Sequence, residues 1–416
     1  MNRRPLTRDR NFLVFWGTQT FSVLGDSFSV IAFPLLMLEA TGSLVQMGLL
    51  TAVMAAGSLL MGLVGGAIVD RFDRRRLLVA CDVARLLLFA AVPVCWAIEP
   101  QVWLLFAVAA VASVFGQLFQ ITYITAVPNI VGRDRVAEAN SRLQATAALA
   151  SIGGPALAGL VAAAFGVTAA IAVDAATFGI SALGLLAVRL SRVAPTATPA
   201  DRPGLGRDLR TGFVTGARFL WGHPVLRALT VFLTITTFVT LGMTDVIIYQ
   251  VRYGLGQGEN VVGYVMAAAG VGTCVAAALS AWLRRTLGFG TLWLGAMTLC
   301  GVAAAVLALS QDVLVLGTAV LGFWFGLMLA AVSSMSLRQL ITPDALLGRV
   351  TAAFWTIHHS LAPLGAAALT AAADRFGASG PLLAVAVVYL GVVGVALFTP
   401  IRSRNPEDRP VDQAPG

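Results

Sequence analysis

Residues Gly65 to Leu78 read GGAIVDRFDRRRLL and connect two long apolar stretches through a short charged loop. Six of the seven residues from Asp70 to Arg76 are charged, four of them arginine and two of them aspartate. Arginine in a short loop marks the cytoplasmic side of a membrane protein. Topology therefore explains the arginines, but it leaves Asp70 and Asp73 without an explanation.

The composition of the chain is that of a membrane protein. Hydrophobic residues make up 58% of the 416 residues and charged residues 12%, whereas a soluble domain carries about 25% charged residues. The four cysteines form no C-x-x-C pair, so we expect neither a disulfide framework nor a metal site. All 28 basic residues are arginine, and a chain without lysine has no P-loop. We expect no cofactor and no enzymatic activity.

Twelve apolar stretches have the length of a membrane span, which needs about 20 residues. They lie at 12–36, 44–69, 77–97, 102–125, 139–164, 167–188, 226–249, 260–282, 291–309, 313–335, 346–371 and 380–400. The pattern predicts an all-α integral membrane protein with 12 transmembrane helices.

The longest polar stretch follows the sixth span and predicts the domain organisation. We expect a first six-helix half at 1–190, a linker at 191–225, a second half at 226–400 and a tail at 401–416. Apolar residues recur at helical spacing late in the linker. They indicate either an amphipathic helix at the membrane surface or an early start of the seventh span.

The arginines orient the chain. With a cytoplasmic N-terminus, 24 of the 28 lie in the tails or in the cytoplasmic loops, so both termini are expected in the cytoplasm. The exceptions are Arg85, Arg227, Arg252 and Arg375. Because the arginines gather at one membrane face, the net charge of +8 does not indicate nucleic-acid binding.

An internal repeat supports two halves of the same orientation. Residues 127–166 resemble 337–377: each begins with a polar turn, continues with small residues around a proline, and closes with Phe-Gly. The charged loop has a weaker counterpart at 279–290, which keeps arginines and lacks both acids. Parallel repeats of this kind occur in transporters that bind their substrate between the halves, near the bilayer midplane.

With its two sets of six spans and the charged loop after the second span, the chain resembles the major facilitator superfamily. Its loop signature G-x-x-x-D-R-x-(G/D)-R-R is matched by Gly66, Asp70, Arg71, Asp73, Arg74 and Arg75. Four stretches are similar to the branch that contains macrolide-efflux proteins and the enterobactin exporter. They are VLGDSFSVIAFPLLMLEATGS, DRFDRRR with CDVARLLL, AVDAATFGISAL and GFVTGARFLWGHPVLR.

The resemblance implies proton-coupled export of a small amphipathic molecule, such as a drug, a macrolide-like compound or a siderophore, by alternating access. It implies a multi-pass monomer in the cell membrane, with the substrate, protons and lipid as partners. Two signatures of proton-coupled exporters are incomplete. The fourth helix lacks the usual arginine, and of the fifth-helix motif only Gly154, Pro155 and Gly159 are present.

Two ionisable residues inside spans are candidates for proton coupling. Asp26 lies 14 residues into the first span, and an intramembrane carboxylate costs about 2.5–3.5 kcal/mol to insert, so it usually has a function. The alternative is a structural hydrogen bond next to Gly25. Histidine as a residue type titrates near physiological pH, so His358, near the middle of the eleventh span, is the second candidate. The alternative is a hydrogen-bonded core residue. Asp174, near the outer end of the sixth span, is expected to be a rim residue or a helix-packing residue.

Polar and aromatic residues in the spans indicate where a substrate cavity would lie. Besides Asp26, the candidates are Gln117, Gln120, Tyr123, Asp245, Tyr249, Tyr264, Trp324 and Trp355. Large apolar substrates need few polar contacts. Each of these residues is equally compatible with ordinary packing.

The charged loop is also expected to form a cytoplasmic gate. Its predicted members are Gly66, Asp70, Arg71, Asp73, Arg74 and Arg349. Asp70 lies at a helix C-terminus, where the helix dipole disfavours it. The resemblance points to the N-terminal end of the eleventh span as its partner when the inside is closed.

Two other functions remain open on the same sequence. One is an uptake symporter for a small metabolite, and the other is a non-transporting receptor or assembly partner.

Overall fold

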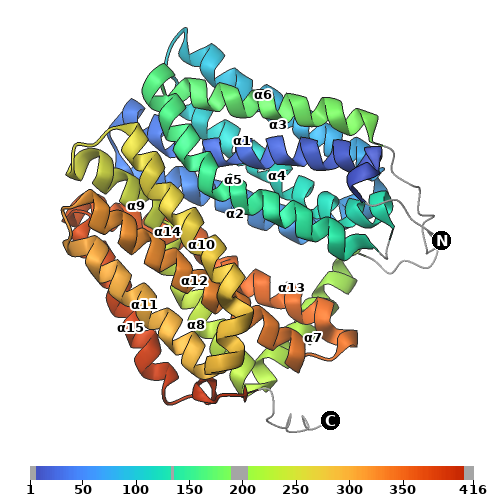
Figure 1. The fold of residues 1–416 in the computed structure, drawn as a ribbon, viewed down its shortest axis with the longest axis vertical. Coiled ribbons are helices and arrows are strands. Elements are labelled where there is room, and N and C mark those ends of the chain that lie inside the picture. Colours follow the sequence, from blue (N-terminus) through green and yellow to red (C-terminus); the bar gives the residue numbers. More distant parts are fainter. Residues whose placement is uncertain (1–5, 133–134, 189–204, 407–416) are drawn as a thin grey trace. The chain divides into compact units, whose positions relative to one another are not determined.

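The computed structural model describes residues 6–132, 135–188 and 205–406, and these parts of the chain are helical, without a strand (Figure 1). The first six long helices are α1 (Arg10–Thr41), α2 (Leu44–Arg71), α3 (Arg74–Trp96), α4 (Val102–Val131), α5 (Val136–Phe165) and α6 (Val167–Ala187). The helices that follow are α7 (Leu205–Gly222), α8 (Pro224–Thr240), α9 (Met243–Tyr249), α10 (Glu259–Leu287), α11 (Phe289–Leu309), α12 (Val313–Ile341), α13 (Asp344–Ser360), α14 (Ala362–Phe376) and α15 (Ser379–Ala396).

The chain forms two compact units. The first comprises Met1–Ala200 with Gly256–Ala267, and the second comprises Asp201–Leu255 with Ala268–Gly416. Among the described residues, eleven helices are long and apolar enough to cross a membrane. The consecutive helices α13 and α14, separated at Leu361, supply the twelfth span. The all-α fold with twelve spans that the sequence predicts is therefore confirmed.

Two predicted spans are interrupted, although their sequences read as continuous apolar stretches. The seventh span consists of α8, α9 and a π-helical turn at Gln250–Gly254. At its break, a Cβ on Gly242 would lie 3.0 Å from the Ala366 carbonyl oxygen, so α8–α9 and α14 approach closely there. In the eleventh span Pro363 stands in the first turn of α14, and a proline has no N–H for a continuous helical ladder.

The linker helix α7 is separate from the seventh span. It ends at Gly222, and α8 starts with Pro224 at its first position, which is a favoured place for proline. A Cβ on Gly216 would lie 3.0 Å from Ala353 Cβ, because α7 packs closely on α13. Of the two interpretations of this segment, the early start of the seventh span is therefore wrong.

Equivalent helices pack in the same way within each half. In the first half α1 contacts α5 and α6, and α3 contacts α4 and α6. In the second half α8 contacts α14 and α15, and α11 contacts α12 and α15. The loop arginines also repeat: Arg74 donates to the Thr125 carbonyl at 3.3 Å, and Arg284, about 210 residues later, donates to the Ser333 carbonyl at 3.3 Å.

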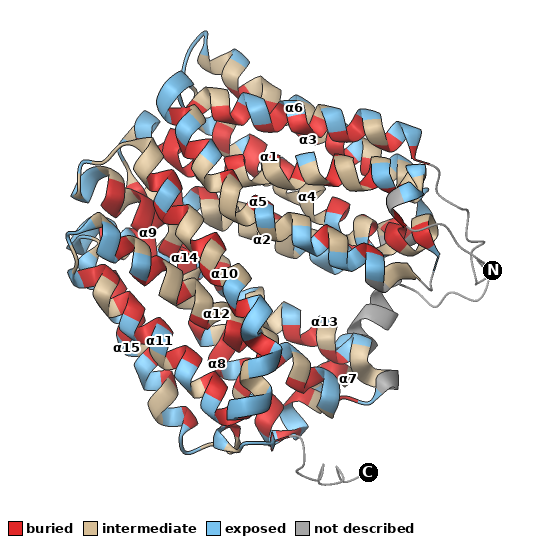
Figure 2. Ribbon diagram, in the orientation of Figure 1, coloured by how far each residue is buried: buried red, intermediate tan, exposed pale blue. Residues whose placement is uncertain are grey.

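The helix α1 is the most enclosed helix of the first half. Of its most apolar 18 residues 67% are buried, against 17% for α2 (Figure 2). A side chain on α1 is therefore surrounded by other helices of the same half, chiefly α5 and α6. This enclosure sets the environment of Asp26.

Candidate functional site

An ion pair lies inside the first half. Arg85 on α3 donates from its Nη2 atom to the Asp26 carboxylate on α1. The Arg85 side chain is only 10% exposed, and that of Asp26 is 33% exposed. Each charge provides the opposite charge for the other, because an ionised group that is kept from water must be paired. The pair joins charged residues that stand within two apolar membrane helices.

Two further carboxylates surround this pair. Asp174 on α6 is fully buried and accepts hydrogen bonds from Ser29 on α1 and from Thr177, the latter at 3.3 Å. Asp82 lies on α3, one turn before Arg85, and is also fully buried. The cluster therefore combines three carboxyl groups, Asp26, Asp82 and Asp174, with one guanidinium.

Close packing holds the cluster together. Gly25 allows α1 to approach α6, since a Cβ there would lie 2.9 Å from Thr177 Cβ. The Arg85 guanidinium carbon lies 3.8 Å from the centre of the Phe178 ring on α6, a cation–π distance. Asp26 thus lies in a polar site with a counter-charge, where gain of a proton would remove the ion pair.

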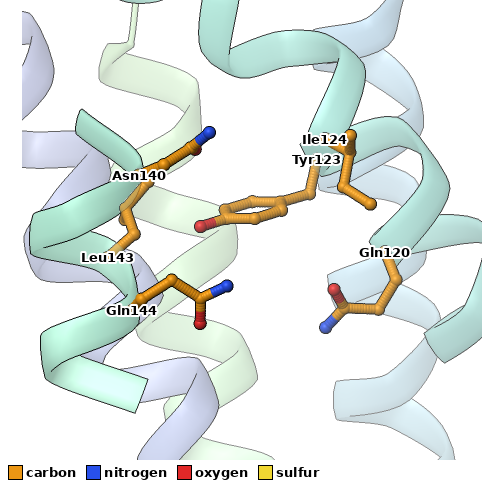
Figure 3. A pocket seen from close by; sticks show the side chains of 6 residues that line it. All are labelled: Gln120, Tyr123, Ile124, Asn140, Leu143 and Gln144. Atoms are coloured by element: carbon orange, nitrogen blue, oxygen red, sulfur yellow. The ribbon is translucent and has the colours of Figure 1, made fainter. Parts of the chain in front are cut away.

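A small pocket lies between α4 and α5 of the same half (Figure 3). Its volume is about 250 Å³, and it is lined by Gln120, Tyr123, Ile124, Asn140, Leu143 and Gln144. The Tyr123 side chain extends from α4 toward α5 (Figure 3). Its ring stacks on Phe15 of α1, with the ring centres 5.6 Å apart. Two of the predicted cavity residues, Gln120 and Tyr123, therefore share one pocket, to which Asn140 and Gln144 add amide groups.

The other predicted cavity residues lie elsewhere. The Gln117 amide nitrogen is directed toward α2, 3.9 Å from where a Cβ on Gly62 would be. Tyr264 is half-exposed on α10, and Tyr249 stacks on Tyr253 at 5.4 Å between ring centres. Asp245 is buried in α9. Trp324 packs edge-on against Phe323 within α12.

His358 belongs to an aromatic cluster on α13 of the second half. Its Nε2 atom lies 3.1 Å from the Thr237 hydroxyl of α8, and its ring stacks on Phe354 with centres 5.2 Å apart. Trp355 packs on the same histidine, at 5.5 Å. Arg338 from α12 lies 3.6 Å from the Phe354 ring centre. His358 thus has the hydrogen bond and the ring contacts of a packed residue.

The two acids of the charged loop differ in position. Asp73 precedes α3 and caps it, accepting a hydrogen bond from the Arg76 backbone N–H at 3.0 Å. Asp70 lies in the last turn of α2, but its side chain is outside the described residues. Arg71 is exposed at the end of α2.

The remaining gate and fifth-helix residues lie on three helices. Gly66 on α2 has no atom within 4 Å of an added Cβ, and Arg349 is exposed on α13. On α5, a Cβ on Gly154 would overlap Ser27 of α1, and one on Gly159 would lie 2.6 Å from the Glu259 carbonyl oxygen. Pro155 stands within the continuous α5. The incomplete fifth-helix motif is thus a close-packing face.

Sequence reasoning identified Asp26 but missed most of its surroundings. Arg85 was visible only as an arginine that departs from the cytoplasmic pattern. Asp82 stands three residues before it and is not among the predicted residues, and Asp174, expected at the rim or in helix packing, belongs to the cluster. The available signal was that isolated charges of opposite sign on apolar helices pair with each other.

Comparison with known proteins agrees with this architecture. The model of the Major Facilitator Superfamily matches residues 15–366. The chain is 30% identical over 386 residues to the multidrug efflux pump Tap of Mycolicibacterium fortuitum, covering 90% of this chain and 92% of that protein. It is 28% identical over 337 residues to the enterobactin exporter EntS of Escherichia coli O1:K1, covering 78% and 76%.

A solved structure gives the same fold. The nucleoside transporter NupG aligns with a TM-score of 0.75 at 10% identity, covering 94% of this chain and 98% of that chain. At this identity the likeness concerns the fold alone. With its matching family model, its twelve spans and its repeated halves, the chain belongs to the Major Facilitator Superfamily of membrane transporters.

Proposed function

We propose that this transporter exports small amphipathic molecules from the cell in exchange for protons. The observation that carries the proposal is the Asp26–Arg85 ion pair between α1 and α3. A carboxylate held in a membrane helix is expensive to keep, and such residues mark substrate or proton pathways. The names of the two relatives, a multidrug efflux pump and an enterobactin exporter, support export and this class of substrate.

In the proposed cycle, Asp26 takes up a proton from the outer side and releases it to the cytoplasm. Protonation forms an O–H bond on the carboxylate and removes its charge, so the attraction to Arg85 weakens. The site then differs in charge between its two states, and a difference of this kind lets proton binding shift a conformational equilibrium. Alternating access of the two halves, with both termini in the cytoplasm, converts that shift into transport.

The α4–α5 pocket supplies part of the substrate surface in this proposal. Its lining combines amide groups from Gln120 and Gln144 with the Tyr123 ring and with aliphatic groups. Surfaces of this composition accommodate amphipathic molecules that share shape rather than a particular functional group. His358 and Trp355 form a second aromatic surface, in the second half.

Asp70 has a separate role in the proposal, as a cytoplasmic latch. It would pair with the N-terminal end of the eleventh span, which carries Arg349, when the inside is closed. The position of Asp70 in the last turn of α2 supports this role, because its own helix dipole disfavours a carboxylate there. Asp73 needs no such partner, since it caps α3.

Flux measurements in proteoliposomes test the proposal. The purified chain is reconstituted, a pH gradient is imposed, and three probes are followed: ethidium, a macrolide and a catecholate siderophore. We expect the gradient to drive at least one probe opposite to the proton flow. Absence of flux for all three would instead favour a receptor or assembly partner.

The direction of transport is tested in cells. Cells that lack the protein should accumulate an exported probe more than cells that express it. The reverse result, in which expression raises accumulation, would contradict export and favour an uptake symporter. Expression level is matched by quantifying the protein in the membrane fraction.

A further inference from the structure

Two charged side chains of the cluster, Asp82 and Arg85, lie next to each other and have buried atoms without a hydrogen-bond partner. Neither carboxylate oxygen of Asp82 has a partner among the described residues, although this residue is fully buried. The Ser181 hydroxyl of α6 faces Asp82 without closing a hydrogen bond to it. The Nε atom of Arg85 is likewise buried and without a partner. A buried polar group without a partner is costly, so each such group in a folded protein calls for an explanation.

The helix α3 brings these two groups to the same face. Asp82 and Arg85 are three residues apart within α3, and side chains at this spacing are neighbours on a helix surface. Arg85 reaches across to Asp26 on α1 through its Nη2 atom, which leaves Asp82 without a charged donor. A rotation of the guanidinium toward its own helix would pair both unsatisfied groups.

The surroundings leave room for such a rotation. On the α4 side the residue that faces the guanidinium is Gly116, where even an added Cβ would remain 3.8 Å from the Arg85 Cζ atom. On the α6 side the flat ring of Phe178 lies beneath it, and a ring face accepts a guanidinium in more than one orientation. Neither neighbour fixes Arg85 in its present position.

We propose that Arg85 exchanges carboxylate partners, between Asp26 on α1 and Asp82 one turn back on α3, as Asp26 gains or loses its proton. This inference rests on the proposed proton coupling at Asp26 and adds Asp82 as a second coupling residue. In one state Asp26 is ionised and paired, and Asp82 carries a proton. In the other state Asp26 holds a proton from the outer water, and Asp82 has released its own proton to the cytoplasm and pairs with Arg85. Asp26 then passes its proton to Asp82, which restores the first state, so the proton of Asp26 reaches the cytoplasm by way of Asp82.

Charge balance favours this exchange over simple loss of the pair. Arg85 always has one ionised partner, so no unpaired guanidinium is left between the membrane helices. The other groups that face the exchange are Asp174 from α6 and Cys81 on α3. Asp174 is already engaged by Ser29 and Thr177, which makes Asp82 the acceptor that is free to take Arg85.

A double-mutant cycle on the purified full-length chain tests the exchange without any substrate. Thermal unfolding is followed by tryptophan fluorescence for the wild type, Asp26→Asn, Asp82→Asn and the double variant. Each single variant leaves Arg85 one carboxylate partner, so we expect small losses in Tm. The double variant leaves Arg85 without either carboxylate partner. Its fall in Tm should therefore clearly exceed the sum of the falls in the two single variants.

The matched control is the double variant Asp26→Asn/Asp174→Asn, for which we expect additive losses. Additive losses in the Asp26/Asp82 cycle would overturn the exchange. A larger excess in the Asp26/Asp174 cycle would also overturn it, because Asp174 would then be the alternative partner. Failure of the Asp26/Asp82 double variant alone to fold counts as an excess and supports the proposal.

A transport readout separates the exchange from a purely structural role. In proteoliposomes loaded with ethidium, Asp82→Asn should lose most of its response to an imposed pH gradient, and Asp82→Glu should recover it. An unchanged response in Asp82→Asn would contradict the role of Asp82. If the wild type shows no gradient response, the proposed function fails, while the thermal cycle still decides whether Arg85 has two partners.

Discussion

The two halves share their helix packing but differ in what lies between equivalent helices. Between α1, α3 and α6 the first half places Asp26, Arg85 and the two further acids of the cluster. Between α8 and α15 the second half places a neutral pair, in which the Thr240 and Tyr389 hydroxyls lie 2.8 Å apart. At this position the second half therefore packs around neutral groups where the first half packs around charged ones.

Other buried groups in the interior of the second half also form hydrogen bonds between uncharged partners. The Trp293 indole N–H donates to the Ser334 hydroxyl at 3.1 Å, and the Cys300 thiol donates to the Phe323 carbonyl at 3.4 Å. The Tyr389 ring packs on Phe323, with centres 5.5 Å apart. This interior is stabilised by packing and local hydrogen bonds, without an ion pair among these residues. In the proposed function, coupling belongs to the first half, and this part of the second half has a supporting role.

The largest effect on transport is expected from the charged loop, which differs between the two halves. The loop of the first half carries Asp70 and Asp73, whereas its counterpart at 279–290 carries no acid. Asp70→Asn should lower gradient-driven ethidium flux at least about tenfold, which corresponds to a loss of about 1.4 kcal/mol of coupling. The matched variant Asp73→Ser keeps a cap on α3 and should keep flux near that of the wild type. Equal flux in both variants would refute the latch.

A second test concerns the close approach of α1 and α6 at the cluster. Gly25→Ala would bring Cβ within 2.9 Å of Thr177 Cβ, and overpacking of this kind costs about 1–3 kcal/mol. Gly17→Ala, on the same helix, meets nothing within 4 Å and serves as the control. Thermal unfolding should show a clear loss of Tm for Gly25→Ala only. A similar Tm for both variants would mean that the cluster is loosely packed.

A smaller effect is expected from the neutral interior. Tyr389→Phe removes the hydroxyl that meets Thr240, and a buried hydrogen bond contributes about 0.5–1.5 kcal/mol. Tm should fall modestly, while the dependence of ethidium flux on the pH gradient should keep its shape. A displaced pH profile in this variant would place part of the coupling in the second half and break the comparison.

The smallest effect is a pH dependence of stability at His223, just before the span that begins at Pro224. Burial lowers the pKa of His223, so its contribution to stability is complete above the unfolded pKa of about 6.5 and declines as the pH falls below it. His223→Gln should reduce the drop in Tm between about pH 8 and about pH 5.5. An unchanged drop would assign the acid sensitivity to other groups.

Much of the fold is predictable from the sequence, because the length and polarity of membrane spans are set by the bilayer. The twelve spans and the repeat follow from that constraint. The breaks at Gly242 and Leu361 do not, since the apolar pattern continues through both of them. They depend on a close helix approach and on the position of Pro363 within its span.

The candidate site was only partly predictable. Asp26 is visible as a lone acid in an apolar helix, but its partner depends on how α1 and α3 are rotated, which the sequence does not specify. Asp73 lies three residues after Asp70 and shares its chemistry, yet it caps α3. Residues only three positions apart, one at the end of a helix and one at the start of the next, therefore belong to different local structures.

The most direct measurement of the central claim is ethidium flux in proteoliposomes containing Asp26→Asn, with and without an imposed pH gradient. The wild type and Asp26→Glu, which keeps a carboxylate, serve as matched controls. If the first-half cluster couples protons to transport, the wild-type rate rises with the gradient, whereas Asp26→Asn moves ethidium at the same rate with and without it. A gradient response of wild-type size in Asp26→Asn would contradict the claim that Asp26 is the coupling residue.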